Sequence, residues 1–234
     1  MAAFCIMDNR LSEDTAPHLR HPESMTDLVY LHGFSSGPGG NKGRFAREWA
    51  EARGIPCHAP DLNLPTFETL TLTAQVAAVE ALLRTLASPP VLVGSSLGGF
   101  VATAVAHRGA PLAALILLAP AIHFARRRST GADWAEYRAQ GWMTCLHHAQ
   151  GQPLRLGPEL LHDLPNWLDD DAWRIPVPTT ILHGRADAAV PLAESEAYAQ
   201  RNPGTRLHVL EDDHGLLAPA SLVCLQAALE AAFA

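Results

Sequence analysis

Along this chain, short runs of consecutive apolar residues alternate with stretches in which apolar residues recur every three or four positions. The runs predict buried strands and the repeats predict amphipathic helices. The expected strands are 28–31, 55–59, 91–93, 115–118, 179–182 and 207–210, and the expected helices are 43–53, 72–86, 97–108 and 222–233. Apolar strands separated by helices indicate a mostly parallel sheet covered on both faces. We therefore expect an α/β fold of the doubly wound type.

Residues 121–176 interrupt this alternation with a mixture of polar residues, prolines and aromatic side chains. A segment of this length between two strands of one sheet is typical of an insertion, and we expect a helical cap here. The spacing of Trp134, Tyr137 and Trp142 places them on or near one helix face, where they could line a substrate pocket. The same three side chains could equally form a small core of their own.

The composition fits a single domain spanning residues 1–234, with residues 1–26 as a polar arm or short edge element. Hydrophobic residues make up 48% and charged residues 18% of the chain, which suits a soluble protein with a substantial core. The net charge of −7 argues against a nucleic-acid partner or an anionic membrane surface. The short basic run 126–128 is expected to be a solvated face. The oligomeric state is not predicted.

Cysteine spacing and the N-terminal residues bear on cofactors and location. The four cysteines lie far apart without a C-x-x-C pair, which indicates neither a zinc site nor a disulfide scaffold. No basic leader followed by an apolar stretch begins the chain, and no run approaches about 18 apolar residues. We expect a cytoplasmic protein without a metal or another cofactor.

The strongest chemical signal is the G-x-S-x-G sequence at residues 94–98, between an expected strand and an expected helix. A serine on such a sharp turn has a strained backbone, so the residues two positions away must be very small. Gly94 and Gly98 meet that condition for Ser96, whereas Ser95 has larger residues at the same offsets. The pattern predicts Ser96 as a nucleophile.

A serine nucleophile needs a base, and the base needs a carboxylate to orient it. Strand 179–182 leads into a loop with Asp187, and strand 207–210 leads into a loop with His214. Both loops should lie at the carboxyl edge of the sheet, where ligands bind in open α/β folds. We predict His214 as the general base and Asp187 as the orienting acid.

Other residues could compete for these roles. His183 lies close to the end of its strand, so we interpret it as structural. Asp212 and Asp213 share a loop with His214, and we expect both to be solvated. The pair at 147–148 lies in the inserted segment and matches no metal-ligand pattern.

Two backbone N–H groups are candidates for an oxyanion hole. Leu97 follows the nucleophile, and Phe34 follows the first strand, which are the positions that this type of turn uses. The glycine-rich stretch 37–40 could suggest a phosphate-binding loop, but Lys42 is followed by Gly43 rather than by Ser or Thr. We expect that stretch to be a turn beside the pocket.

Four segments, taken in order, resemble the α/β-hydrolase superfamily: L-H-G-F at 31–34, G-S-S-L-G-G-F at 94–100, H-G-R-A-D at 183–187 and D-H-G at 213–215. The resemblance covers about residues 27–233 and is greatest to small bacterial YqiA-like esterases, although Gly37 stands where their pattern has a second serine. It implies an α/β-hydrolase fold and cofactor-free hydrolysis of small acyl esters or thioesters.

Two other classes of function remain open at this point. The first is a different enzyme on the same residues, such as a peptidase, a carbon–carbon bond hydrolase or a perhydrolase. The second is a binding module that has kept the fold and lost turnover. The presence of Ser96, His214 and Asp187 together favours an enzyme, and the acyl and leaving groups are not predicted.

Overall fold

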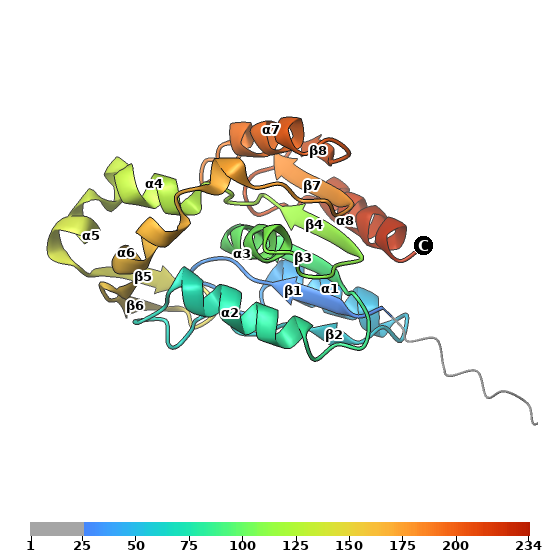
Figure 1. Cartoon of the computed structure of the whole chain (residues 1–234), viewed down its shortest axis with the longest axis horizontal. Coiled ribbons are helices and arrows are strands. Elements are labelled where there is room, and N and C mark those ends of the chain that lie inside the picture. Colours follow the sequence, from blue (N-terminus) through green and yellow to red (C-terminus); the bar gives the residue numbers. More distant parts are fainter. Residues whose placement is uncertain (1–25) are drawn as a thin grey trace, which may run out of the picture.

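A sheet of six parallel strands forms the centre of the computed structural model, which describes residues 26–234 (Figure 1). The strands are β1 (Leu28–Leu31), β2 (Cys57–His58), β3 (Val91–Ser95), β4 (Ala114–Leu118), β7 (Thr179–Gly184) and β8 (Arg206–Leu210). Their order in the sheet is β2-β1-β3-β4-β7-β8. β2 is therefore added on one side of β1, and the later strands are added in sequence on the other side, beginning with β3. The carboxyl ends of β1 and β3 are therefore neighbours at the point where the order reverses, which is where ligands bind in such sheets.

Helices cover both faces of the sheet, so the doubly wound α/β prediction is confirmed. Alternate residues of β1 show the two layers, since Val29 and Leu31 pack on one side and Leu28 and Tyr30 on the other. Figure 1 shows α2 and α3 in front of the sheet and α1 and α8 behind it. The bounds are α1 (Asn41–Glu51), α2 (Leu72–Leu83), α3 (Leu97–His107), α7 (Leu192–Arg201) and α8 (Pro219–Ala232).

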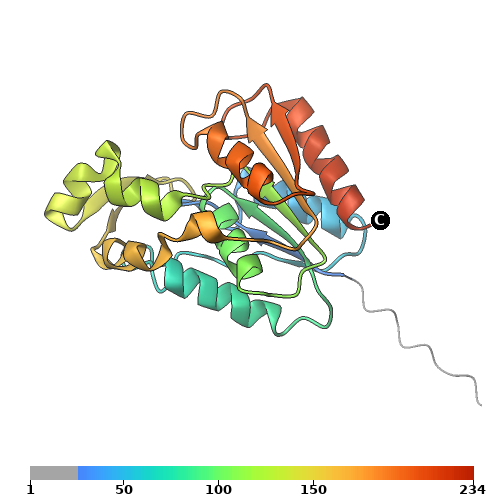
Figure 2. The ribbon, with the colours of Figure 1, turned by 45° about the horizontal axis from the view of Figure 1, so that its top comes forward.

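The segment between β4 and β7 lies beyond the carboxyl ends of the strands (Figures 1 and 2). It contains α4 (Phe124–Thr130), α5 (Ala135–Gln140), α6 (Glu159–Asp163) and 3₁₀ turns at Ala132–Trp134, Leu164–Trp167 and Asp170–Ala172. It also contains an antiparallel hairpin of β5 (Met143–His147) and β6 (Gln152–Leu156), which the sequence analysis did not predict. We call residues 121–176 the inserted segment.

Buried polar contacts fix the inserted segment to the start of α2. The Asp163 carboxylate accepts hydrogen bonds from the Thr73 backbone N–H (2.9 Å) and hydroxyl (2.5 Å), and the Trp167 indole N–H donates to the same hydroxyl (3.1 Å). On the other side of the hairpin, the His148 N–H donates to the Ser35 carbonyl at 2.8 Å. The hairpin turn therefore lies against the loop that follows β1.

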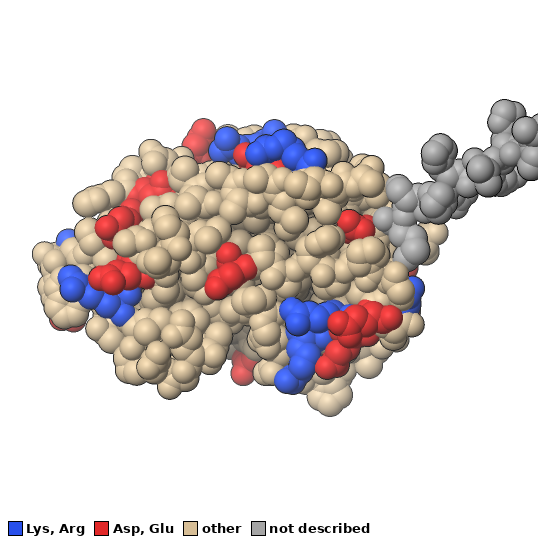
Figure 3. Space-filling model, turned by 90° about the horizontal axis from the view of Figure 1, so that it is seen from below, with Lys and Arg blue, Asp and Glu red and all other residues tan. Residues whose placement is uncertain are grey.

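On the face that Figure 3 shows, the charged side chains lie in small groups rather than in one field. On the face seen in Figure 3, basic side chains form separate clusters, some of them beside acidic ones, with uncharged surface between. The run 126–128 is not the freely solvated face that we expected, because Arg126 pairs with Asp171, Arg127 with Glu194 and Arg128 with Asp133.

Three expectations from the sequence concern the chain ends, the thiols and membranes. The expected arm at 1–26 lies, except for its last residue, outside the described residues. Cys57, Cys145 and Cys224 carry free thiols. Within residues 26–234, no helix combines the length and the apolar character needed to cross a bilayer.

Candidate active site

Ser96 lies on a sharp turn between β3 and α3, with backbone angles φ 53° and ψ −116°. This conformation is uncommon for a residue with a side chain and is held by the surrounding structure. A Cβ atom at Gly94 would lie 2.5 Å from the Gly98 carbonyl oxygen, and one at Gly98 would lie 2.2 Å from the Leu31 carbonyl oxygen. Neither position tolerates a side chain, which is the steric reason for the G-x-S-x-G spacing.

The structure brings Ser96, His214 and Asp187 together from three loops at the carboxyl edge of the sheet. The His214 Nε2 lies 3.1 Å from the Ser96 hydroxyl oxygen, and its Nδ1 lies 2.7 Å from Asp187 Oδ2. With a proton on Nδ1 donated to the carboxylate, Nε2 is free to accept the serine proton. The arrangement can therefore activate the hydroxyl of Ser96.

The Asp187 side chain is completely buried, whereas that of His214 is 31% exposed. Burial by itself would raise the pKa of Asp187. Hydrogen bonds from His183, His214 and the Val190 N–H outweigh burial and hold the pKa well below its usual range. Because the carboxylate stays ionised, it can orient His214 at any pH near neutrality.

His183 is fully buried directly beside this carboxylate. Its Nδ1 lies 2.7 Å from the Ser195 hydroxyl, and its Nε2 lies 3.0 Å from the Val190 carbonyl and 3.3 Å from Asp187 Oδ2. The carbonyl and the carboxylate both require a proton on Nε2, so Nδ1 accepts from Ser195. The sequence analysis interpreted His183 as structural, and its contacts show that it supports the buried acid.

The two rival carboxylates are engaged elsewhere. Asp212 accepts hydrogen bonds from the Asp213 and Ala218 N–H groups and from the Ser221 hydroxyl. Asp213 accepts one from the Gly215 N–H at 2.7 Å. These bonds fix the loop around His214 and leave its Nδ1 to Asp187.

Both expected oxyanion donors lie where they could act. Leu97 begins α3, and the first N–H groups of a helix have no acceptor within that helix. Gly33 packs against Ser96, because a Cβ atom at Gly33 would lie 3.2 Å from Ser96 Cβ, and Phe34 follows Gly33 in the chain. Phe34 and Ser96 line the same cavity, and the backbone N–H groups of Phe34 and Leu97 remain the candidate donors.

A cavity of about 670 Å³ opens beside Ser96 and His214. That volume is typical of a pocket for a small molecule. The loop after β1, the start of α1, the hairpin turn and the loop after β8 form its walls. The residues that line the cavity include Phe34, Lys42, Ser96, His148 and His214.

The three aromatic residues predicted for the pocket do not line this cavity. Trp134 is 4% and Tyr137 is 2% exposed, and both belong to the hydrophobic core. Trp142 is 42% exposed on the outside of the hairpin, with the Arg155 guanidinium over its ring. The pocket role is therefore corrected, because core packing occupies the first two side chains and solvent surrounds much of the third.

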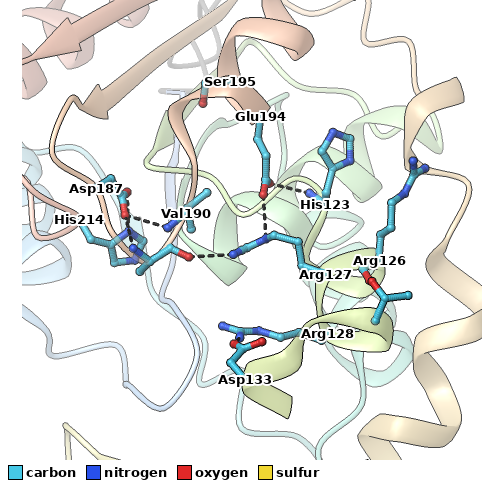
Figure 4. Close-up of polar contacts among 12 residues, drawn as sticks. His123, Arg126, Arg127, Arg128, Asp133, Asp187, Val190, Glu194, Ser195 and His214 are labelled. Carbon is cyan, nitrogen blue, oxygen red and sulfur yellow. Dashed lines mark hydrogen bonds and ion pairs between the residues drawn. The ribbon is translucent and has the colours of Figure 1, made fainter. Parts of the chain in front are cut away.

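Figure 4 shows a second connection between the inserted segment and the site. Arg127 of α4 donates to the Ala189 carbonyl at 2.8 Å and pairs with Glu194 at 2.7 Å. Ala189 belongs to the loop whose N–H groups bind the Asp187 carboxylate. The inserted segment thus contacts the loop that holds the acid.

Lys42, which the sequence suggested only as part of a rejected phosphate-binding loop, lines the cavity from the first turn of α1. Its Nζ donates to the carbonyl oxygens of His214 (3.3 Å) and Gly215 (2.9 Å). Burial lowers the pKa of Lys42 to about 8, although Asp187, Asp212 and Asp213 act in the opposite direction. Its place just after the loop that follows β1, at the same sheet edge as Ser96, was the available signal.

No group of three or more potential metal-binding side chains converges anywhere in the described part of the chain. His147 and His148, which are adjacent in sequence, differ in environment: His147 is buried against the Phe67 ring, and His148 lines the cavity.

The parallel sheet, its helices and the turn at Ser96 form the α/β-hydrolase fold, so the fold that the resemblance implied is confirmed. The chain belongs to the uncharacterised protein family UPF0227, whose model matches residues 27–218. No curated protein matches the sequence.

Solved structures support the same fold. A putative hydrolase from Agrobacterium vitis S4 has a TM-score of 0.78 at 22% identity, covering 90% of this chain and 88% of its own. Est1E from Butyrivibrio proteoclasticus, solved with ferulic acid, has a TM-score of 0.75 at 19% identity with coverage of 90% and 88%. Alpha/beta hydrolase domain-containing protein 10 from mouse has a TM-score of 0.73 at 21% identity, covering 88% of each chain.

Proposed function

We propose that this protein is a serine hydrolase that cleaves small carboxylic esters or thioesters through a Ser96–His214–Asp187 triad. The observation that carries the proposal is the continuous chain of contacts from Ser96 Oγ through both ring nitrogens of His214 to a buried carboxylate. Structural neighbours named as a putative hydrolase and as an alpha/beta hydrolase domain-containing protein support this class of reaction.

The reaction follows from the geometry in two steps. Ser96 Oγ attacks the substrate carbonyl carbon as its proton passes to His214 Nε2, and the Phe34 and Leu97 N–H groups stabilise the oxyanion. The alcohol or thiol leaves with the proton from His214, and the acyl group stays on Ser96. Water then gives a proton to His214 and attacks the acyl carbonyl, which releases the acid and restores the serine.

A panel of p-nitrophenyl esters of graded acyl length tests this proposal directly. We expect turnover with an initial burst of p-nitrophenol, because an acyl-enzyme forms before it is hydrolysed. A fluorophosphonate should abolish turnover in proportion to its incorporation. An enzyme that turns over these esters after complete phosphonate labelling would contradict the role of a serine nucleophile.

The same triad could instead serve a peptidase, a carbon–carbon bond hydrolase or a perhydrolase. Matched amide, thioester, β-diketone and hydrogen peroxide assays separate these reactions by their kcat/KM values. No feature of the cavity favours one of them over ester hydrolysis. A chain that binds these compounds without turnover would be a binding module.

A further inference from the structure

The wall of the cavity that contains Lys42 carries a positive charge, and ester hydrolysis by itself does not require one. Lys42 comes from the first turn of α1, and its Nζ is held in place by the carbonyl oxygens of His214 and Gly215. An ammonium group has three N–H donors, so these two carbonyls leave one donor free to face the cavity. Its charge is thus fixed in the same cavity as Ser96.

Among the described residues, no carboxylate neutralises this charge by direct contact. Asp187, Asp212 and Asp213 are close enough to act on the pKa of Lys42, but none contacts its Nζ, which donates to two carbonyl oxygens. These carboxylates bind His214, the Ala218 N–H and the Gly215 N–H, respectively. Within the same described region, none of the residues that line the cavity is acidic. A protein with a net charge of −7 therefore presents an unpaired cation inside its candidate site.

Two further features of the cavity wall suit an anion. Asn41 and Lys42 begin α1, an 11-residue helix whose first turn carries no acidic side chain and whose N-cap, Gly40, has no side chain to cap it. The free N–H groups of that turn and the helix dipole both favour negative charge at this end. His148, from the hairpin turn, adds a polar ring to the same lining.

We propose that the cavity selects esters or thioesters that carry an anionic group, a carboxylate or a phosphate, away from the bond that is cleaved, and that Lys42 binds this group. This inference rests on the proposed function and names its substrate class. A charge-assisted hydrogen bond in a partly buried cavity changes affinity by roughly tenfold to a hundredfold. Lys42 then determines substrate specificity, and its positive charge should lower the KM for anionic esters more than it changes kcat.

Matched pairs of esters test the proposal on each side of the cleaved bond. For the acyl side, the mono-p-nitrophenyl ester of adipic acid is compared with neutral p-nitrophenyl hexanoate. For the leaving-group side, the hexanoyl ester of 4-hydroxybenzoate is compared with that of methyl 4-hydroxybenzoate. We expect the anionic member of at least one pair to have a KM lower by about tenfold or more.

Two variants of Lys42 separate charge from position. Lys42→Met should remove the preference for the anionic ester, and Lys42→Arg should retain most of it because the positive charge remains. Equal KM values for both members of both pairs in the parent enzyme would overturn the proposal. An equal fall in kcat for anionic and neutral esters in Lys42→Met would also overturn the proposal. That result would mean that Lys42 only positions the loop that contains His214.

A binding measurement keeps this inference distinct from the proposed function. Isothermal titration of Ser96→Ala with the adipate monoester and with p-nitrophenyl hexanoate reports affinity without turnover. If the parent enzyme hydrolyses neither ester yet Ser96→Ala binds the anionic one in a Lys42-dependent manner, the hydrolase proposal fails and this inference stands. Equal affinity within both the acyl-side pair and the leaving-group-side pair, measured in the same way, would overturn the inference whatever the activity.

Discussion

The carboxyl edge of the sheet and the inserted segment that lies beyond it are built in different ways. At the sheet edge, Ser96, Asp187 and His214 each follow a buried parallel strand by a few residues, and backbone geometry fixes where they point. The inserted segment instead depends on contacts between distant residues, such as Thr73 with Asp163 and Arg127 with Glu194. The spacing of residues in the sequence therefore predicts where side chains lie at the carboxyl edge of the sheet much better than it does in the inserted segment.

This difference gives substitutions in the two regions different expected effects. A change at the sheet edge removes a chemical group from a scaffold that remains intact, so activity is lost and stability is kept. A change in the inserted segment removes packing, so stability is lost first. Substitutions in each region can therefore distinguish loss of activity from loss of stability.

Ser96→Ala should lower kcat/KM by at least about 10³-fold, because the substitution removes the proposed nucleophile and leaves only the binding and oxyanion contacts. The melting temperature should stay close to that of the parent. Ser36→Ala is the matched control, since Ser36 lines the same cavity and should retain activity. Mass spectrometry should locate a fluorophosphonate on Ser96, and labelling of Ser95 or Ser36 would place the nucleophile elsewhere.

Asp187→Asn should lower kcat by roughly 10²- to 10⁴-fold, because an amide cannot orient His214 in the productive tautomer. Asp213→Asn is the control from the neighbouring loop, where the carboxylate accepts only the Gly215 N–H, and it should lose less than about tenfold. Steady-state kinetics on one p-nitrophenyl ester compares the two. A larger loss in Asp213→Asn would assign the acid to the loop after β8.

In the inserted segment, Trp134→Ala should cost about 3–5 kcal/mol of unfolding free energy, because the ring is 4% exposed and packs against Phe34, Phe124 and Tyr137. Trp142→Ala, at a ring that is 42% exposed, should cost less than about 1 kcal/mol. Urea denaturation measures both. A marked change in acyl-length preference in Trp142→Ala, with stability unchanged, would restore that residue to the substrate pocket.

The smallest predicted effect is a pH dependence that originates in Lys42. Its pKa of about 8 means that the ammonium is largely charged at pH 7 and largely neutral at pH 9. The KM for the adipate monoester should therefore rise by several-fold to tenfold over that interval, relative to the KM for the neutral hexanoate. Lys42→Arg should show no such rise, because an arginine stays protonated.

The other groups near Lys42 do not produce the same signal. The pKa values of Asp187 and Asp212 lie below their usual range, so both are charged throughout pH 7 to 9, and burial raises the pKa of Tyr30 well above its usual range. His148 and His214 also line the cavity, but Lys42→Arg leaves both in place. A rise in KM that persists in Lys42→Arg would therefore assign the titration to another group.

The sequence predicted the sheet well and the inserted segment poorly, and particular residues show why. Gly94 and Gly98 carry a local steric requirement that can be recognised without a structure, and the strand before each loop located Asp187 and His214. The expected second strand at 55–59 is reduced to Cys57–His58, because an edge strand has a pairing partner on one side only.

The hairpin, the aromatic residues and Lys42 depend on partners far away in the chain. Burial alternates along β5, but an apolar residue, Leu146, stands at one of its exposed positions, so the sequence does not show the alternation. Nothing local indicates that Trp134 faces the core while Trp142 faces solvent. Lys42 matters because the loop after β8 approaches α1, and that contact joins residues more than 170 positions apart. Periodicity and motif spacing cannot report such approaches.

The position of His214 after the last strand has a consequence for how activity arises during folding. Among the described strands, β8 pairs only with β7, and β7 in turn pairs with β4 across the whole inserted segment. Parallel pairing between segments that lie so far apart in the chain is slow compared with local helix formation. A chain in which β1, β3 and β4 have already assembled would display Ser96 and yet lack its base. Recovery of hydrolysis after dilution from denaturant should therefore lag behind the recovery of helical circular dichroism, and esterase activity would report the docking of the final strand.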